Sequence, residues 1–231
     1  MTGADRRFGE HEGPAARFVY EKSHRFFNKL GSFAFGLSAG GVENIPEEGG
    51  AILALNHLHF SDVLWVPAVV PDRAVVVIGR REKVYMPVIG AYLRWMGAKA
   101  IDRPKEGERA SRDVIPTMVE PLEAGRLEVI YGSPNTRTPG IKPGFPTRGI
   151  FEAAERAQVP IVPGVVVGSD RLGSFRGAEV TVKFAPAMPY PQHRREHREM
   201  QYHLWGTQTE LFESVPSVDG HYADAPNPES R

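Results

Sequence analysis

AILALNHLHFSD, residues 51–62, is the stretch of this sequence that decides its fold. Five apolar residues, 51–55, run directly into a polar cluster, which predicts a buried strand that ends in a loop. Ser61 or Asp62 stands where the N-cap of a following helix is expected. Because open α/β sheets bind ligands at the carboxyl ends of their strands, we expect a functional site at this point.

His57 and Asp62 bring a base and a carboxylate into this loop. The ordinary pKa of histidine lets it take a proton from a hydroxyl group at neutral pH. A carboxylate on the other ring nitrogen fixes the tautomer and stabilises the imidazolium as it forms. The spacing H-x4-D also arises by chance, so the alternative is a structural histidine that is hydrogen-bonded near a helix N-terminus.

Predicted strands and helices alternate along the rest of the chain. Strands are expected at 42–45, 51–55, 74–78, 98–101, 127–131, 160–167 and 179–184, and helices at 17–37, 62–70, 87–96, 108–124, 145–158 and 192–215. This order predicts a single-domain α/β fold, in which helices flank a central, largely parallel mixed sheet and an amphipathic helix comes first. The sequence contains no internal repeat, G-x-G-x-x-G or Walker A pattern, so nucleotide binding is not supported.

The composition is that of an ordinary globular protein. Of 231 residues, 41% are hydrophobic and 24% charged, and the formal net charge of zero gives no general attraction to nucleic acid. The absence of cysteine excludes disulfides, covalent cysteine intermediates and cysteine metal sites, and fits a reducing compartment.

The two ends of the chain differ from its middle. We expect residues 1–16 and 216–231 to be disordered, residues 17–40 to form a membrane-interfacial helix, and residues 41–215 to form the main domain. The predicted helix carries Phe18, Phe26, Phe27, Leu30, Phe33, Ala34 and Leu37 roughly on one side, with Lys22, Arg25 and Lys29 elsewhere. Such a helix lies on a membrane or, alternatively, packs on the domain. We expect no cleaved signal peptide, and no apolar run reaches the ~18 residues of a membrane span.

Four blocks, in order, resemble the glycerolipid acyltransferase family typified by bacterial 1-acylglycerol-3-phosphate acyltransferase. They are Asn56-His57-x4-Asp62, Gly90-x6-Gly97-x3-Ile101-x-Arg103, Thr136-Arg137 with Phe145-x2-Arg148-Gly149 downstream, and Val159-Pro160-Ile161-Val162-Pro163. Each block alone is weak, but four in order are specific, and the resemblance covers roughly residues 41–190. The third block departs from the family's F-P-E-G-T-R, because Pro134 and Asn135 stand where Glu and Gly are expected.

The resemblance implies transfer of a fatty acyl group from acyl-CoA or acyl carrier protein to the hydroxyl of a lysophosphatidate-like acceptor in phospholipid synthesis. It implies His57 as general base, Asp62 as its orienting group, and neither cofactor nor metal. The implied phosphate contacts are Arg103, Thr136, Arg137 and Arg80, and because an acyl chain needs an apolar groove we add Trp65, Tyr92 and Trp95 as candidates for it. Arginine suits phosphate because its planar fork binds two oxygens at once, whereas aromatic residues at helical spacing are often core residues instead. The implied location is peripheral, on the cytoplasmic face of the cell membrane, with the membrane surface as a partner and no nucleic acid.

Three alternatives stay open. A zinc hydrolase would use His57-x-His59 with Asp62, or His193 and His197, although the sequence contains no H-E-x-x-H pattern. The altered third block also fits a non-catalytic lipid-binding relative that keeps the fold. Within the enzyme class, the acceptor could instead be glycerol-3-phosphate, another lysophospholipid or a lipid without phosphate.

Overall fold

The structure is a computed structural model. It describes residues 14–70, 73, 75–87, 89–101, 114–132, 140–172, 179–216 and 222–225. Three predicted site residues, Arg103, Thr136 and Arg137, lie outside the described residues, as do Pro134 and Asn135 of the altered block.

Within the described part of the chain, seven strands form one sheet in the order β1-β7-β6-β2-β5-β3-β4. The strands are β1 (Ser38–Gly40), β2 (Ala51–Leu55), β3 (Val75–Arg80), β4 (Lys99–Ile101), β5 (Leu127–Tyr131), β6 (Ile161–Val167) and β7 (Thr181–Phe184). All neighbouring strands run parallel except β6 and β7, which are antiparallel. The predicted α/β fold with a largely parallel mixed sheet is therefore confirmed.

Strand β2 lies at the centre of the sheet, between β5 and β6. Its five residues are at most 1% exposed, which explains why the sequence of this strand is uninterrupted by polar residues. The register places Leu55 beside Tyr131 of β5 and Ala54 beside Pro163 of β6. The ends of β2, β3, β5 and β6 therefore meet along one side of the sheet, which we call the carboxyl edge.

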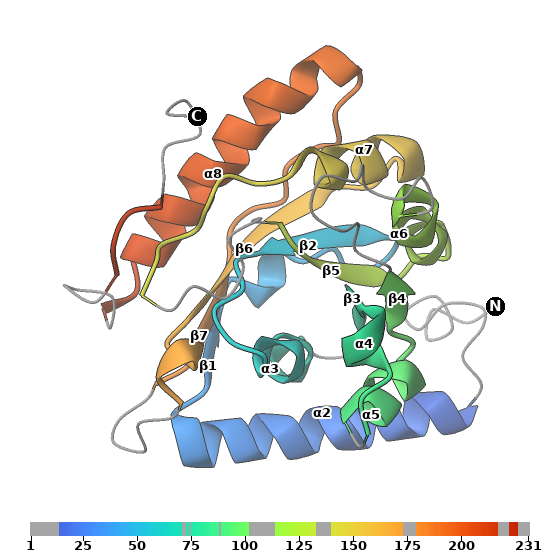
Figure 1. The fold of residues 1–231 in the computed structure, drawn as a ribbon, viewed down its shortest axis with the longest axis vertical. Helices are drawn as coiled ribbons and strands as arrows, with labels where there is room; N and C mark the ends of the chain where they lie inside the picture. The colour runs from blue at the N-terminus through green and yellow to red at the C-terminus, as the bar shows by residue number, and fades with distance from the viewer. Residues whose placement is uncertain are drawn as a thin grey trace.

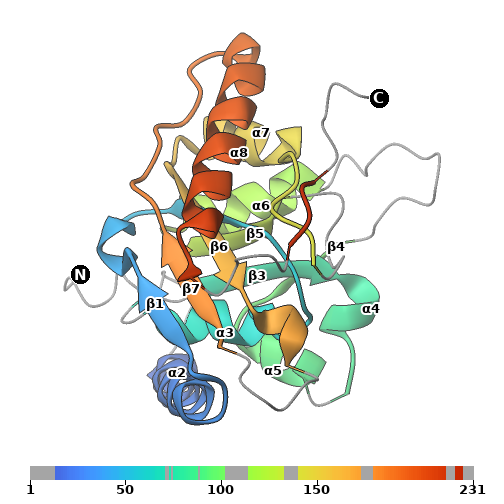
Figure 2. The same cartoon turned by 90° about the vertical axis from the view of Figure 1, so that its left-hand side faces the viewer.

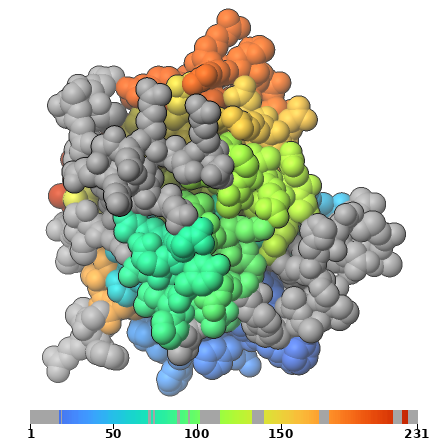
Figure 3. Space-filling model, turned by 45° about the vertical axis from the view of Figure 1, so that its right-hand side comes forward, coloured from blue at the N-terminus to red at the C-terminus, as the bar shows by residue number. Residues whose placement is uncertain are grey.

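Helices cover both faces of the sheet (Figure 1). The first face carries α2 (Pro14–Phe35), α3 (Asp62–Val69), α4 (Arg81–Val84) and α5 (Ile89–Trp95), and the second carries α6 (Val114–Glu123), α7 (Arg148–Ala157) and α8 (His197–Glu213). Figure 2 shows α2 end-on, on the opposite side of the sheet from α8. In Figure 3, α4 and α5 form the surface between α6 and α2. None of the helices in the described ranges is both long and apolar enough to cross a bilayer.

Each face of the sheet has its own core, because successive side chains of a strand point to opposite faces. Leu53 and Leu55 of β2 pack with Trp65 of α3, whereas Ile52 and Ala54 pack with residues of α6, α7 and α8. The largest fully buried members of the second core are Phe151, Ile52, Leu122, Ile150, Ile161 and Leu204.

Glu128 of β5 is an ionisable residue in this apolar interior. Its side chain alternates with Leu127 and Val129, so it points toward the second face, and it is 0% exposed. Neither carboxyl oxygen has a hydrogen-bond partner among the described residues. Burial raises the pKa of Glu128 well above its ordinary value of 4.5, because the charged form has lost its water.

The amphipathic helix α2 has two apolar sides rather than one. Phe27 and Phe35 pack against the first core, and the Phe35 ring meets Trp65 edge-on at 5.5 Å. Phe18, Phe26, Leu30 and Phe33 remain exposed. The Asn28 side-chain amide donates to the Ala68 carbonyl oxygen (2.9 Å), which ties α2 to α3. The helix thus packs on the domain and still presents an apolar stripe.

Predicted element boundaries in the first 45 residues are wrong at several points. Residues 42–45 are not a strand: Val42–Asn44 form a short 3-10 helix, η1, and the strand is β1, just before it. Gly41 has φ +72°, and a Cβ there would lie 1.9 Å from the Phe184 carbonyl oxygen, so the chain turns where a strand was expected. The helix expected over residues 17–40 begins at Pro14, within the stretch expected to be disordered, and ends at Phe35, before Gly36 at φ +53°, so that residues 38–40 are free to form β1.

Residues 222–225 also differ from expectation, since they were predicted to be disordered. Ala223 forms a parallel bridge with Ile141, through Ala223 N–H to Gly140 O (2.7 Å) and Lys142 N–H to Ala223 O (2.9 Å). The Tyr222 hydroxyl donates to Asp170 Oδ1 (2.9 Å) and accepts from Gly168 N–H (3.2 Å). We call residues 222–224 the C-terminal strap, because they join the segment at 140–142 to η2 (Ser169–Arg171), which follows β6.

Candidate active site

His57 and Asp62 form a buried pair at the carboxyl edge, where the chain leaves β2 and enters α3. His57 Nδ1 lies 2.8 Å from Asp62 Oδ2. The histidine is 9% exposed and the aspartate 0%. Because Nδ1–H donates to the carboxylate, the lone pair of His57 lies on Nε2, which is the arrangement a general base requires. The structure brings together the two residues that the sequence predicted as a pair.

Asp62 holds the whole loop as well as the histidine ring. Its Oδ2 also accepts Leu58 N–H (2.9 Å) and His59 N–H (3.0 Å). Three N–H donors converging on one oxygen stabilise a negative charge there and fix the backbone on which His57 is carried. The other oxygen, Oδ1, is buried and has no hydrogen-bond partner among the described residues.

Asn56 fixes the point at which the chain leaves the sheet. Its side-chain amide donates to Val166 O (2.8 Å) and its Oδ1 accepts Val166 N–H (2.7 Å). This side chain therefore satisfies both backbone groups of a β6 residue at the place where β2 stops pairing. These two hydrogen bonds fix the position at which the loop that carries His57 begins.

Tyr131, the last residue of β5, stacks on the His57 ring. The ring centroids are 4.2 Å apart and the planes are inclined by 23°. The phenol oxygen is buried and has no hydrogen-bond partner in the described part of the chain. Burial, and then the negative charge of Asp62, raise the pKa of Tyr131 well above its ordinary value, so the phenol stays neutral. Sequence reasoning missed this residue, although it shares a face with Leu127 and Val129.

His59, Ser61 and Trp65 form a second chain of hydrogen bonds beside the pair. Trp65 Nε1–H donates to Ser61 Oγ (2.8 Å), and Ser61 Oγ lies 2.8 Å from His59 Nδ1. Trp65 was predicted for the acyl-chain groove, but it is buried in the first core, which fits the alternative interpretation of core packing. The His59 side chain is exposed.

Of the other predicted site residues, the structure describes the side chains of Arg80 and Tyr92. Arg80 ends β3 on the carboxyl edge, is 41% exposed in its side chain and lies 3.3 Å from Glu82. Tyr92 of α5 is half-buried beside Phe27 of α2, with ring centroids 5.3 Å apart, and burial raises its pKa. Nothing is described of the Trp95 side chain.

The zinc alternative finds no set of ligands in the described ranges, where no cluster of three or more histidine, aspartate or glutamate side chains is arranged to hold a metal ion. His57 and His59 each direct Nδ1 at a neighbouring side chain rather than toward a shared point. His197 is buried between Glu155 (2.7 Å) and Arg148 (3.4 Å), and His193 lies before the helix, in extended backbone.

Comparisons with known proteins show the family of this chain. A family model described as Acyltransferase matches residues 37–167, which is more than half of the 231 residues. The 1-acyl-sn-glycerol-3-phosphate acyltransferase of Bacillus subtilis (strain 168) is 26% identical over 126 residues, which are 54% of this chain and 60% of that protein. The chain thus matches about three fifths of the length of this relative.

A solved structure shares the fold. The crystal structure of the 1-acyl-sn-glycerophosphate (LPA) acyltransferase PlsC from Thermotoga maritima superimposes with a TM-score of 0.70 at 18% sequence identity. The match covers 90% of this chain and 83% of that one. At this identity the likeness concerns the fold, which is the one predicted from the sequence.

Proposed function

Because the chain belongs to the acyltransferase family, we propose that it transfers a fatty acyl group from an acyl thioester to the hydroxyl of a lysophosphatidate-like acceptor, as a step of phospholipid synthesis. The observation that carries the proposal is the buried pair of His57 and Asp62 at the end of the central strand. The lone pair on Nε2 suits proton removal from a hydroxyl, and no cofactor is required because a thioester is already activated.

The proposed reaction proceeds by direct attack. His57 Nε2 takes the proton of the acceptor hydroxyl while the hydroxyl oxygen bonds to the thioester carbonyl carbon. The tetrahedral intermediate collapses, the carbon–sulfur bond breaks, and the departing thiolate takes the proton from the imidazolium. Asp62 stabilises the imidazolium between these two transfers and stays ionised. General base catalysis contributes ~10²–10⁴-fold, and positioning of the two substrates supplies much of the remainder.

Substrate binding is proposed for the same edge of the sheet. Arg80, at the end of β3, is the described cation of the proposed phosphate set, to which Arg103, Thr136 and Arg137 belong through the sequence resemblance. For the acyl chain, the described candidate is Tyr92, which lies where α5 meets α2. Trp95, at the end of α5, belongs to the proposed groove through the sequence prediction. The acyl donor is either acyl-CoA or acyl carrier protein.

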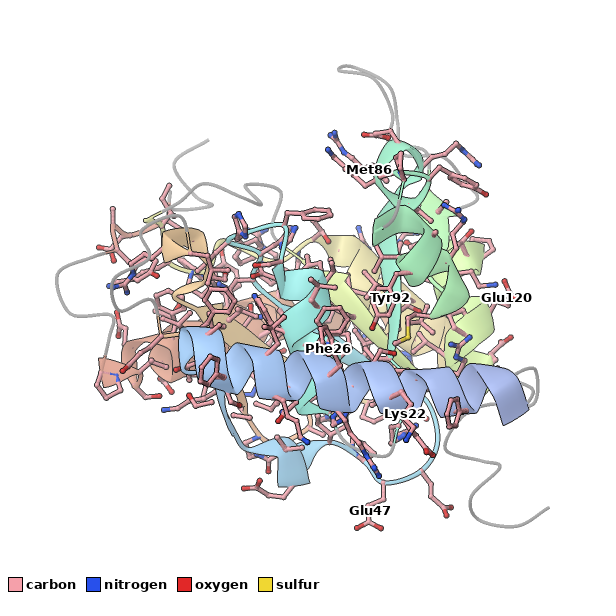
Figure 4. All side chains as sticks on the ribbon, turned by 90° about the horizontal axis from the view of Figure 1, so that it is seen from below. Lys22, Phe26, Glu47, Met86, Tyr92 and Glu120 are labelled. Atoms are coloured by element: carbon pink, nitrogen blue, oxygen red, sulfur yellow. The ribbon has the colours of Figure 1, made fainter. Side chains whose placement is uncertain are left out.

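The membrane surface is the proposed partner of helix α2. Its stripe consists of Phe18 (58% exposed), Phe26 (59%), Leu30 (39%) and Phe33 (93%). At 100° per residue these positions fall within about a third of the helix circumference. Lys22, Arg25 and Lys29 are also exposed on α2, and Lys22 Nζ lies 5.2 Å from the Phe18 ring centroid. Figure 4 views the molecule from this side, with Lys22 and Phe26 on α2. Exposed aromatic residues with neighbouring bases suit peripheral attachment at the cytoplasmic face.

The proposal is tested by acyl transfer from radiolabelled acyl-CoA, or acyl carrier protein thioester, to lysophosphatidate. We expect transfer by the wild type and its loss in His57→Ala, with His203→Ala, a change at an exposed histidine of α8, as the matched control. Lysophosphatidate binding without transfer from either donor would favour the non-catalytic relative instead.

A further inference from the structure

The two histidines of the His57-x-His59 segment carry their protons on opposite ring nitrogens. Trp65 Nε1–H can only donate, so Ser61 Oγ accepts from it at 2.8 Å. The Ser61 hydroxyl proton is then available to His59 Nδ1, which lies 2.8 Å from Ser61 Oγ. Ser61 N–H also points at His59 Nδ1, at 3.3 Å. A nitrogen that accepts from two donors carries no proton, so the proton of neutral His59 lies on Nε2.

His59 is held in place by the same carboxylate that orients the base. Its backbone N–H donates to Asp62 Oδ2, which also accepts from His57 Nδ1–H. Whereas His57 is buried, the His59 side chain is exposed, and its Nε2–H has no hydrogen-bond partner among the described residues. The loop therefore presents both a proton acceptor, His57 Nε2, and an N–H donor, His59 Nε2–H.

We propose that His59 is a substrate-binding residue that donates its Nε2–H to a phosphate oxygen of a bound substrate. The inference rests on the proposed function, because it assumes a phosphorylated substrate at this edge. The exposure of His59 favours the headgroup over the reacting carbonyl, since stabilisation of an oxyanion is strongest where water is excluded. Phosphate is a strong acceptor, and a hydrogen bond to a charged group is about twice as strong as a neutral one.

Ser61 and Trp65 are positioning residues in this scheme. They occupy Nδ1, and thereby keep the donor on Nε2 and the ring in one orientation. The phosphate has two sources, the acceptor lipid and, for an acyl-CoA donor, coenzyme A. The same N–H donor would bind a phosphate oxygen of either one, so an experiment has to distinguish the two sources.

The test compares His59→Ala and His59→Gln with the wild type, and uses His203→Ala as the control. The KM for lysophosphatidate is measured at saturating acyl-CoA, and the KM for acyl-CoA at saturating lysophosphatidate. We expect His59→Ala to raise one of the two KM values about tenfold while kcat stays within about twofold. The glutamine variant should recover most of this loss, because its side-chain amide places an N–H donor close to the position of Nε2.

The substrate whose KM rises is the one that carries the phosphate: lysophosphatidate or acyl-CoA. Unchanged KM values in both arms, or a fall in kcat with no change in KM, would overturn the inference. A thermal melt shows whether each variant is folded. If His59→Ala does not fold, the KM values of His59→Gln are compared with those of the wild type instead. A wild type that transfers no acyl group would contradict the proposed function alone. In that case, loss of lysophosphatidate or coenzyme A binding in His59→Ala, measured by calorimetry, would still support the phosphate contact, and unchanged binding of both would refute it.

Discussion

Replacement of Asp62 by asparagine tests the central pair of the site with little change of shape. Asparagine has almost the same volume, and its amide oxygen can still accept the N–H groups of Leu58 and His59. What the variant lacks is the negative charge that faces the His57 imidazolium. That charge matters only after the proton has moved to His57, so the loss should appear in kcat rather than in KM.

The size of the effect follows from the contact. His57 Nδ1 and Asp62 Oδ2 are 2.8 Å apart and the carboxylate is fully buried. At an effective dielectric constant of ~20, two unit charges at this separation interact by ~6 kcal/mol, which is the ceiling for the stabilisation. The amide dipole of asparagine retains part of it. We therefore expect kcat to fall about 10³-fold, since ~1.4 kcal/mol corresponds to a factor of ten.

The assay is steady-state acyl transfer to lysophosphatidate, with a thermal melt of each protein. Asp224→Asn is the matched control, because this carboxylate is exposed and contacts Lys142 (2.8 Å) rather than the catalytic pair. Its kcat should equal that of the wild type. A folded Asp62→Asn variant that keeps more than about a tenth of the wild-type kcat would refute the assigned role of the carboxylate.

Three further predictions concern the core, the stacked ring and the helix surface. Glu128 has a raised pKa in the folded state, so the folded protein keeps a proton that the unfolded chain loses, and stability falls as the pH rises above about 4.5; Glu128→Gln should remove this fall and melt at a higher temperature than the wild type at pH 8. Tyr131→Leu removes the ring that stacks on His57 and should lower kcat about tenfold, whereas Tyr131→Phe keeps the ring and should keep most of the activity. Phe26→Ser with Phe33→Ser removes exposed apolar area and should weaken co-sedimentation with anionic phospholipid vesicles at least tenfold.

Each of these predictions has a result that would contradict it or a control variant. Equal melting temperatures of wild type and Glu128→Gln at pH 8 would contradict an unpartnered buried carboxyl. Equal kcat values for Tyr131→Leu and the wild type would show that the stack does not hold the imidazole. For α2, Ser32→Ala changes an exposed position of the same helix and should bind vesicles like the wild type.

The parts of the site that the sequence predicted are those encoded locally. His57 and Asp62 are five positions apart, and the strand before them and the helix after them follow from a short apolar run and a capping position. Tyr131 was missed because its contact with His57 depends on the register between β2 and β5, which no local pattern contains. For the same reason residues 222–225 were expected to be disordered: their partners lie far away in the sequence.

The boundary at residues 42–45 failed for a different reason. Residues 42–45 were predicted to form a short strand, but Gly41 turns the chain and the Asn44 side-chain amide donates to the Phe184 carbonyl oxygen (3.1 Å). A side chain that competes for a backbone partner overrides a weak strand propensity. Helix α2 shows the same limit, since its apolar residues divide between the domain and the solvent only once α3 is in place.

The C-terminal strap has a consequence for the order in which the chain acquires its structure during synthesis. Tyr222 bonds Asp170, which is 52 positions earlier, so this contact forms only after the last helix has left the ribosome. Until then the segment at 140–142 and the turn after β6 are joined by the hydrogen bond from Gly140 N–H to Asp170 Oδ2 (3.0 Å), without the support of Tyr222 and Ala223. The catalytic pair, by contrast, is complete within one short stretch and needs only its neighbouring strands. We therefore expect a nascent chain stalled before Tyr222 to form the sheet while the segment at 140–142 still lacks the contacts of the C-terminal strap.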